Sequence, residues 1–130
     1  KKFPSPEFPG EKFSSEAIVW RRIAKQNYLV RYVNEIYRNQ EIQEGGLSDT
    51  SIIKKRLKEN PKGMALRYNE EVEIMTTFLY RLKSSVNYVR SCLHADYSFM
   101  KIISEAIVKP ILLCSLPVGI VIYLKDELFV

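Results

Sequence analysis

Turn-forming residues are scarce through most of this chain. Between residues 11 and 109 the only glycines and prolines are Gly45, Gly46, Pro61 and Gly63. Because glycine and proline are the residues that most often interrupt regular elements, this scarcity favours long helices with few turns. The 130 residues, 46% of them hydrophobic and 27% charged, fit one domain with a modest core.

The sequence also has little from which a catalytic or metal site could be built. It contains a single histidine, His94, which excludes a cluster of several histidines. His94 lies two residues from Cys92 and from Asp96, and side chains at that spacing do not face each other on a helix. There is no phosphate-binding loop, no paired CxxC motif and no GxSxG motif. We therefore expect no enzyme activity, no cofactor, no metal and no small-molecule substrate.

Two features have more than one interpretation, and a third has one. The carboxylates of Glu70, Glu71 and Glu73 could hold a cation, or they could form a solvated first helical turn that the helix dipole favours. Cys92 and Cys114 could form a disulfide in an oxidising compartment, or they could be two buried thiols. The chain begins with Lys-Lys and has no apolar leader, which we interpret as a processed or trimmed product.

Local signals predict an extended arm followed by helices. The arm covers residues 1–13, which hold three prolines. A first helix is predicted from about Ser15 to Asn39, with Ser14 as its N-cap. A second is predicted to begin near Ser48 or Asp49 and to end before Pro61, and a fourth to run from Asp96, as its cap, to Val108.

The strongest periodic signal lies in the third predicted helix. Its apolar residues recur with a 4-3-4-3-4-3-4 spacing, which is typical of a helix in a coiled pair or a bundle: Tyr68, Val72, Met75, Leu79, Leu82, Val86, Val89 and Leu93. The sequence therefore predicts an all-α fold, a single-domain up-and-down helical bundle of about five helices spanning residues 1–130.

The formal net charge of +5 arises entirely in the first half of the chain. Residues 1–63 hold 13 lysines and arginines against 8 carboxylates, and residues 64–130 hold 7 of each. A one-sided basic surface attracts acidic proteins, polyanions or anionic membranes. The second tract favours docking of an acidic partner, and the alternatives are an ordinary solvated helix face and a nucleic-acid site. The candidate binding residues form two basic tracts: Arg21, Arg22, Lys25, Arg31 and Arg38, and then Lys54, Lys55, Arg56, Lys58 and Lys62.

Two apolar features could contact a membrane or another partner. The first helix carries Trp20, Tyr28 and Tyr32, which could be exposed or could pack under other helices. Residues 110–124 contain no charge, yet the run is too short for a spanning helix. That run is either a buried final helix or strand, or a membrane-active surface. The candidate apolar contacts are Trp20, Tyr28, Ile111, Leu112, Leu113, Leu116, Val118, Ile120, Val121, Ile122 and Leu124.

Taken in order, these parts resemble the abalone sperm acrosomal proteins, a family that includes egg-envelope lysin and its fusion-associated paralogue. The resemblance covers roughly residues 14–105. It rests on a long first helix, a glycine-bearing loop, a second helix opened by an aspartate, and a long third helix. The residues that carry it are Asn27, Tyr28, Leu29, Val33, Ile36, Gly45, Gly46, Asp49, Ile53, Leu57, Ala65 and Tyr68.

The two cysteines and the apolar run at residues 110–124 resemble the fusion-associated paralogue more than lysin. The resemblance implies a five-helix bundle that is secreted, stored in the acrosomal vesicle and released at the egg. It implies action without bond cleavage on an anionic membrane or an egg-envelope glycoprotein. A second copy of the chain is a further candidate partner. The alternatives are an intracellular helical module that docks an acidic protein, and a helical nucleic-acid-binding domain.

Overall fold

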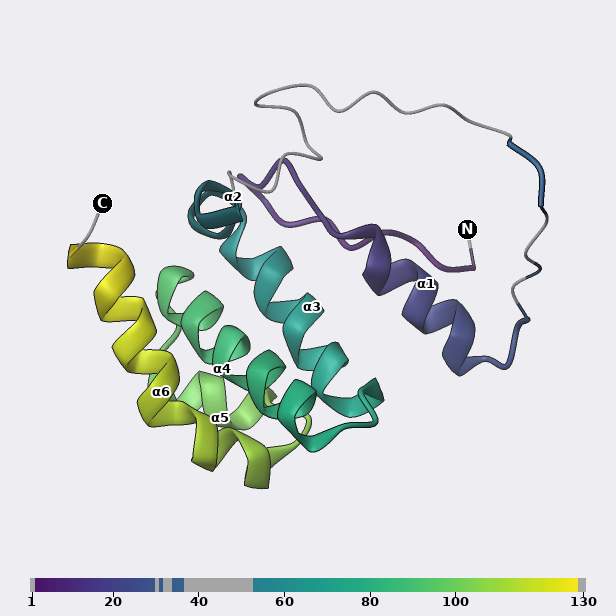
Figure 1. The fold of residues 1–130 in the computed structure, drawn as a ribbon. Coiled ribbons are helices and arrows are strands. Elements are labelled where there is room, and N and C mark those ends of the chain that lie inside the picture. The colour runs from purple at the N-terminus through teal and green to yellow at the C-terminus, as the bar shows by residue number, and fades with distance from the viewer. Residues whose placement is uncertain (1, 30, 32–33, 37–52, 129–130) are drawn as a thin grey trace.

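The computed structural model describes residues 2–29, 31, 34–36 and 53–128 of the chain (Figure 1). These described residues form no strand, and the all-α prediction is confirmed. The arm, described from residue 2 to residue 13, contains no regular element. The six helices in the described part are α1 (Glu16–Lys25), α2 (Ile53–Glu59), α3 (Pro61–Ile74), α4 (Phe78–His94), α5 (Phe99–Glu105) and α6 (Lys109–Leu128).

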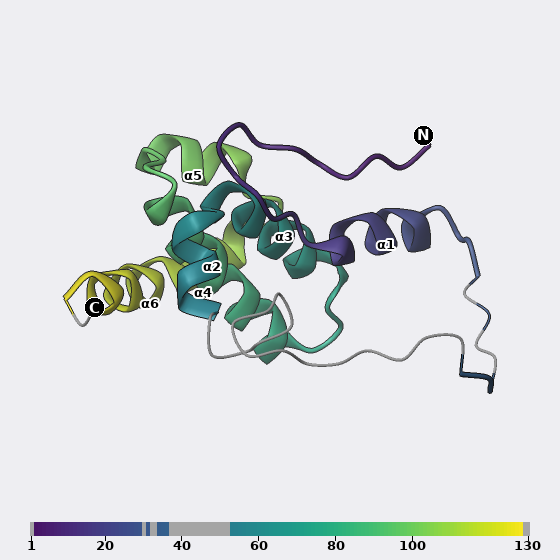
Figure 2. The ribbon, with the colours of Figure 1, turned by 90° about the horizontal axis from the view of Figure 1, so that it is seen from above.

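Helices α3, α4 and α6 form the body of the bundle (Figures 1 and 2). The α3 and α4 helices are joined by a short turn and run antiparallel. The α6 helix runs in the same direction as α4, because Ser85 of α4 meets Ser115 of α6 and Val89 meets Gly119. The short α5 helix lies between α4 and α6 in the sequence, and this segment returns the chain to the end of the bundle at which α4 begins. The α1 helix lies beside α3, on the side of the hairpin opposite α6 (Figure 1).

The core lies where α3, α4, α5 and α6 meet. Its buried members are Ala65, Tyr88, Val89, Cys92, Ile102, Ala106 and Leu112. The hydroxyl of Tyr88 donates to the Ile102 carbonyl at 3.0 Å, which satisfies a buried polar group. Burial raises the pKa of Tyr88 above its usual range, and it raises the pKa of the Cys92 thiol to about 12. Neither cysteine is bonded; Cys92 is buried and Cys114 is exposed.

The prediction of one long third helix is wrong, because the chain breaks at residues 75–77. Met75 has an extended backbone, and α4 begins after Thr77, its N-cap. The side chain of Arg81 donates from Nε to the Val72 carbonyl at 2.9 Å, which satisfies one of the free acceptors at the end of α3. The apolar seam therefore belongs to two helices that pack on each other.

The first predicted helix is also shorter than expected. The α1 helix begins after Ser15 and ends at Lys25, followed by a turn in which Asn27 has φ of +59°. This left-handed conformation ends helices, and asparagine adopts it more readily than most residues. Residues 37–52 lie outside the described part, so the predicted starts of the second helix at Ser48 or Asp49 are not described, whereas its end before Pro61 is confirmed.

The fourth predicted helix begins at a different residue. Asp96 does not cap it, because Asp96 has φ of +57° and closes the end of α4. The Tyr97 amide donates to the Cys92 carbonyl and the Asp96 amide to the Leu93 carbonyl, which is the Schellman pattern. Ser98 caps α5 by accepting from the Lys101 amide. Helix α5 ends at Glu105, before the predicted Val108.

The N-terminal arm is held against the start of α3. The carboxylate of Glu11 accepts hydrogen bonds from the backbone amides of Lys62 and Gly63 at 2.7 and 2.8 Å. The Asn60 side-chain oxygen accepts from the amides of Lys12 and Phe13. A carboxylate at this position satisfies free helix N–H groups and suits the positive end of the helix. The arm therefore acts as a cap for α3.

Small residues allow α4 and α6 to approach closely. The hydroxyls of Ser85 and Ser115 lie 2.6 Å apart in the interface, and both residues are buried. A Cβ at Gly119 would lie 2.7 Å from the Val89 Cβ and 3.1 Å from the Val86 carbonyl oxygen. Real Cβ atoms do not approach carbon so closely, so the separation of the two helices depends on this glycine.

Replacing Gly119 with alanine should therefore destabilise the protein. In an unobstructed helix interior this change stabilises by roughly 1 kcal/mol. Here the overpacked methyl should cost about 1–3 kcal/mol, seen as a lower urea midpoint. Val118→Ala, on the exposed side of the same helix, is the control and should change stability by less than about 0.5 kcal/mol. Unchanged stability of Gly119→Ala would show that the helices can separate freely.

Candidate interaction surfaces

Helix α6 is apolar on two opposite sides, and only one side is buried. Ile111 and Leu112 were expected to contact a partner, but they lie in the core, 8% and 1% exposed. That expectation is therefore wrong for these two residues. Leu116 and Ile120 pack against the core, and Ile122 is half-buried, so they too belong to the inner side.

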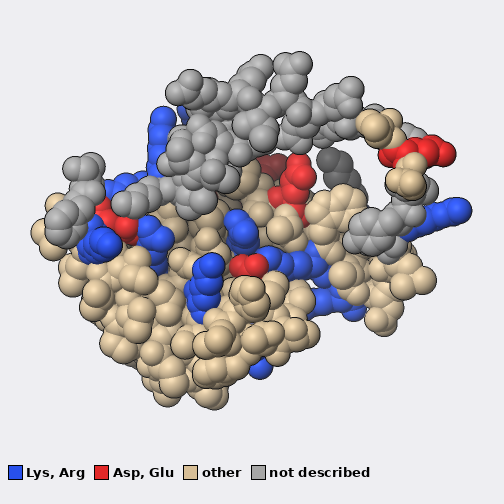
Figure 3. Space-filling view, in the orientation of Figure 1, with Lys and Arg blue, Asp and Glu red and all other residues tan. Residues whose placement is uncertain are grey.

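The opposite side of α6 faces outward. We call this the outer face of α6, and it consists of Leu113, Cys114, Pro117, Val118, Val121, Leu124 and Leu128, all of them exposed. Leu113 is 64% exposed, Val121 65% and Leu128 77%. In Figure 3 the lower part of the molecule, over α6 and the adjoining helices, is uncharged almost throughout. An apolar face of this length usually marks an interaction surface.

Further exposed apolar side chains precede α6. Phe99, Met100, Ile103 and Ile107 of α5 and the following turn are exposed, and Met100 is the most exposed of them. The amide nitrogen of buried Asn69 donates to the Glu105 carbonyl, and its oxygen accepts from the Ile107 amide. This pair of hydrogen bonds holds the α5–α6 connection against α3. The exposed apolar groups are thus carried by an anchored segment.

The acidic and the basic side chains of α6 differ in whether they are paired within the protein. Asp126 is buried and Glu127 forms an ion pair with Lys58 at 3.1 Å. Lys109 and Lys125 are exposed, and neither forms an ion pair within the part of the chain that the structure describes. The carboxylates of this helix are therefore compensated within the protein, and its cations remain available to an anionic partner.

A buried polar cluster anchors the end of α6 to α4. Arg90 donates to Asp126 from both Nε and Nη2, the latter at 2.8 Å, and His94 Nε2 lies 3.3 Å from the same carboxylate. The ring of Tyr123 packs edge-on against His94. Burial alone would raise the pKa of Asp126, but the hydrogen bonds from Arg90 and His94 outweigh it and hold that pKa below its usual range.

This cluster gives a pH dependence whose sign follows from the lowered pKa. A carboxyl whose pKa is lower in the folded state stabilises the fold above its unfolded pKa, about 3.9, and loses that contribution as the pH falls. We expect Asp126→Asn to be less stable than wild type at pH 6, and the difference to shrink below about pH 4. Urea unfolding at several pH values measures it. A difference that is constant from pH 6 to pH 2 would contradict the role of the carboxylate.

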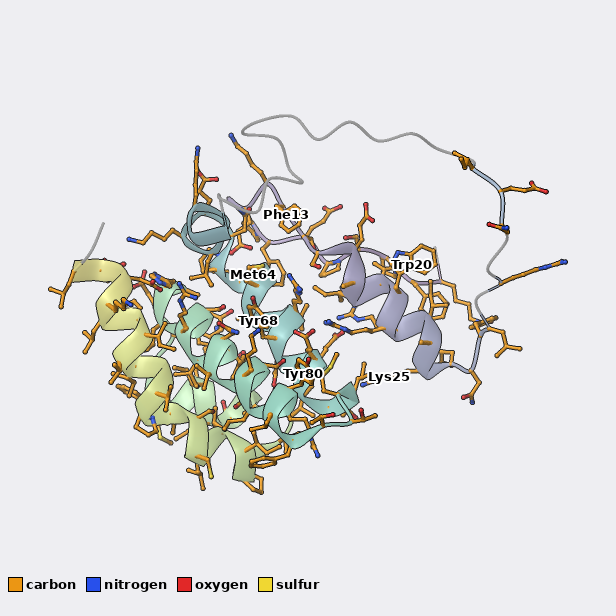
Figure 4. All side chains as sticks on the ribbon, viewed as in Figure 1. Phe13, Trp20, Lys25, Met64, Tyr68 and Tyr80 are labelled. Carbon is orange, nitrogen blue, oxygen red and sulfur yellow. The ribbon has the colours of Figure 1, made fainter. Side chains whose placement is uncertain are left out.

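The three residues of the first basic tract that lie on α1 are paired within the protein. Arg21 forms an ion pair with Glu71 and Arg22 with Glu70, each at 2.7 Å, and Lys25 pairs with Glu73. Figure 4 shows Lys25 on the side of α1 toward α3. Arg21 also donates to the Arg67 carbonyl at 3.1 Å. These glutamates lie in the last turns of α3, so they are neither a first turn nor, within the described residues, part of a metal-binding group.

The remaining predicted basic residues are spread along the chain. Lys55 is exposed beside Glu59, Lys58 pairs with Glu127, and Lys62 follows the first residue of α3. Arg31 is exposed and lies beyond the end of α1. Arg38 and the side chains of Lys54 and Arg56 lie outside the described part. Of the second tract, the structure therefore describes only the side chains of Lys55, Lys58 and Lys62.

The two predicted aromatic contacts are both exposed. Trp20 is 60% exposed, and Figure 4 shows it on the side of α1 that faces away from α3. Tyr28 is 48% exposed and is partly covered by the arm. Its ring meets Phe3 edge-on at 6.0 Å, and its hydroxyl bonds to Lys2. Tyr32 and Val33 lie outside the described residues. The interpretation that Trp20 packs beneath other helices is therefore wrong.

Comparison with known proteins adds no relative. No protein-family model, no curated protein and no solved structure matches this chain. Within the described residues, no helix is both long enough and apolar enough to span a membrane. The features that bear on function are therefore the outer face of α6 and the charge pairing of α1.

The ion pairs between α1 and α3 can be tested by a double-mutant cycle. We expect Arg21→Met and Glu71→Gln to show a coupling free energy of about 1 kcal/mol or more, because both side chains are largely shielded from solvent. The stability of each variant is measured by urea unfolding, with the fluorescence of Trp20 reporting on α1. The exposed pair Lys55–Glu59 is the matched control, and its coupling should be at most about 0.5 kcal/mol. Equal, near-zero couplings would show that α1 docks without help from these charges.

Proposed function

We propose that this protein is a non-enzymatic, membrane-active protein that inserts the outer face of α6 into the interfacial region of an anionic bilayer. The observation that carries the proposal is the exposure of an uncharged apolar stripe along a 20-residue helix. A helix that lies in a membrane interface buries one apolar face and keeps its polar side in water. Here the rest of the bundle takes the place of the polar side.

Charge supports a bilayer over an apolar protein partner. The protein carries a net charge of +5, and the lysines of α6, Lys109 and Lys125, are exposed near the two ends of the stripe. Cations next to an inserted apolar face gain about 1 kcal/mol each near an anionic membrane surface. Leu113 and Leu128 lie fifteen residues apart, so the stripe is about 22 Å long at 1.5 Å per residue. That length suits a helix lying parallel to the surface.

The alternatives that depend on a free basic face gain less support. Arg21, Arg22 and Lys25 are each paired with a glutamate of the same chain. An acidic protein or a nucleic acid would have to displace those glutamates before it could use these cations. The pairing therefore favours contact through the apolar surface.

The resemblance to the abalone sperm acrosomal proteins supplies a biological setting for the proposal. In that setting the protein is secreted, stored in the acrosomal vesicle of sperm and released at the egg surface. It would perturb or fuse membranes during fertilisation and act stoichiometrically. An egg-envelope glycoprotein is the alternative partner in the same setting.

Cys114 allows a direct test, because it lies on the outer face whereas Cys92 is buried. A fluorescent NBD label on Cys114 should brighten and shift to the blue with vesicles of phosphatidylglycerol and phosphatidylcholine, and less with phosphatidylcholine alone.

Val121→Asp should weaken vesicle binding about tenfold or more, since it removes a valine that the bilayer would bury and adds a charge in its place. Leu29→Asp, an exposed residue that follows α1 on the side of the bundle opposite α6, is the control and should bind like wild type.

Two results would count against the proposal. One is the absence of a spectral change with any lipid composition at low salt. The other is a dimer, detected by sedimentation, that Val121→Asp dissociates in the absence of lipid. That result would assign the outer face of α6 to a second copy of the chain.

A further inference from the structure

A cleft between α3 and α4 lies near the turn that joins them. Its volume is about 360 Å³, within the usual size of small-molecule sites. Figure 4 shows two of its aromatic side chains, Tyr68 on α3 and Tyr80 at the start of α4. The residues that line the cleft are Arg67, Tyr68, Glu71, Met75, Tyr80, Lys83, Ser84 and Asn87.

The cleft has an excess of positive charge. Glu71 is the one carboxylate in its wall, and that carboxylate is paired with Arg21 of α1 at 2.7 Å. Arg67 and Lys83 supply two cations, and neither forms an ion pair in the described part of the chain. With Glu71 neutralised, the cleft presents two uncompensated positive groups to whatever enters it.

One donor in the cleft has no acceptor. The Nε of Arg67 is buried, and no hydrogen-bond partner for it lies among the described residues. The guanidinium stands over the ring of Tyr68, 5.3 Å from its centroid. A buried charged donor without an acceptor is costly and calls for an explanation. This Nε is shielded from solvent, so an oxyanion in the cleft would reach it once the guanidinium turns toward the cleft. The oxyanion would then supply the missing acceptor in the geometry that arginine favours.

The walls suit a ring next to that anion. Tyr80 is 60% exposed at the rim, Tyr68 is half-buried, and Met75 lies between the two helices. Aromatic faces pack against flat or saturated rings, while Ser84 and Asn87 offer polar groups to hydroxyls. We propose that this cleft binds the sulfate or phosphate ester of a small ring-bearing molecule such as a sugar, with Arg67 and Lys83 on the oxyanion and Tyr80 on the ring. This site is separate from the outer face of α6.

Calorimetric titration of the full chain tests the proposal and separates the two sources of the oxyanion. The probes are N-acetylglucosamine 6-sulfate, glucose 6-phosphate and neutral N-acetylglucosamine. At least one ester should bind about tenfold more tightly than the neutral sugar. Which of the two esters binds more tightly identifies the preferred oxyanion.

Variants locate the binding. Arg67→Lys keeps the positive charge but removes the planar set of guanidinium N–H donors, including Nε. It should weaken ester binding about tenfold. Lys83→Met should weaken it several-fold, and Lys109→Met, an exposed lysine of α6, is the matched control that should not change it. Tyr80→Ala should weaken the ester more than it weakens inorganic sulfate. Because Lys83 and Tyr80 are exposed, these variants should fold even where Arg67→Lys does not.

Three outcomes would overturn the proposal. The first is no binding of either ester at millimolar concentration. The second is equal affinity for the esters and the neutral sugar. The third is ester binding that Lys83→Met and Tyr80→Ala leave unchanged while Lys109→Met weakens it, which would place the anion on α6.

Discussion

The close approach of α4 and α6 is the contact on which the rest of the arrangement depends. Gly119 and the serine pair Ser85–Ser115 bring the two helices together, and the Arg90–Asp126 cluster holds their ends. Since α6 is apolar on both sides, docking it through one side necessarily leaves the other outside. The exposed apolar face of α6 is therefore a direct result of how the bundle is packed, and no separate element is needed to present it.

Much of the fold could be predicted from local sequence. The scarcity of glycine and proline predicted helices, and Pro61 marked the end of α2 correctly. The seam from Tyr68 to Leu93 predicted one helix where there are two, because its 4-3 spacing continues unchanged across the turn after Met75. Thr76 and Thr77 were the available signal, since threonine side chains favour caps over helix interiors. Asn27 gave the corresponding signal at the end of α1, but the apolar period beyond it masked that signal.

The candidate site could be predicted only in part. The uncharged run at residues 110–124 pointed to α6, but composition alone could not say which side of the helix faces the core. The basic tract on α1 was predicted as a free surface, because its partners lie 48 to 50 residues away in sequence. Only the tertiary arrangement brings Arg21 to Glu71 and Arg22 to Glu70. The cleft at Arg67 had no signal in the sequence, since its lining residues are ordinary members of two helix faces.

The contacts of the arm and α1 differ from those of the hairpin in the length of chain that they close. In the hairpin Arg81 reaches Val72 across 9 residues, and in the neighbouring α4–α5 contact Tyr88 reaches Ile102 across 14. By contrast, Glu11 reaches Lys62 across 51 residues and Arg21 reaches Glu71 across 50. Closing a longer loop costs more conformational entropy, and the cost must be met before the contact forms. We therefore expect the α3–α4 hairpin to form first and the N-terminal segment to join it late. The Glu11 carboxylate would then cap and stabilise an α3 helix that has already formed.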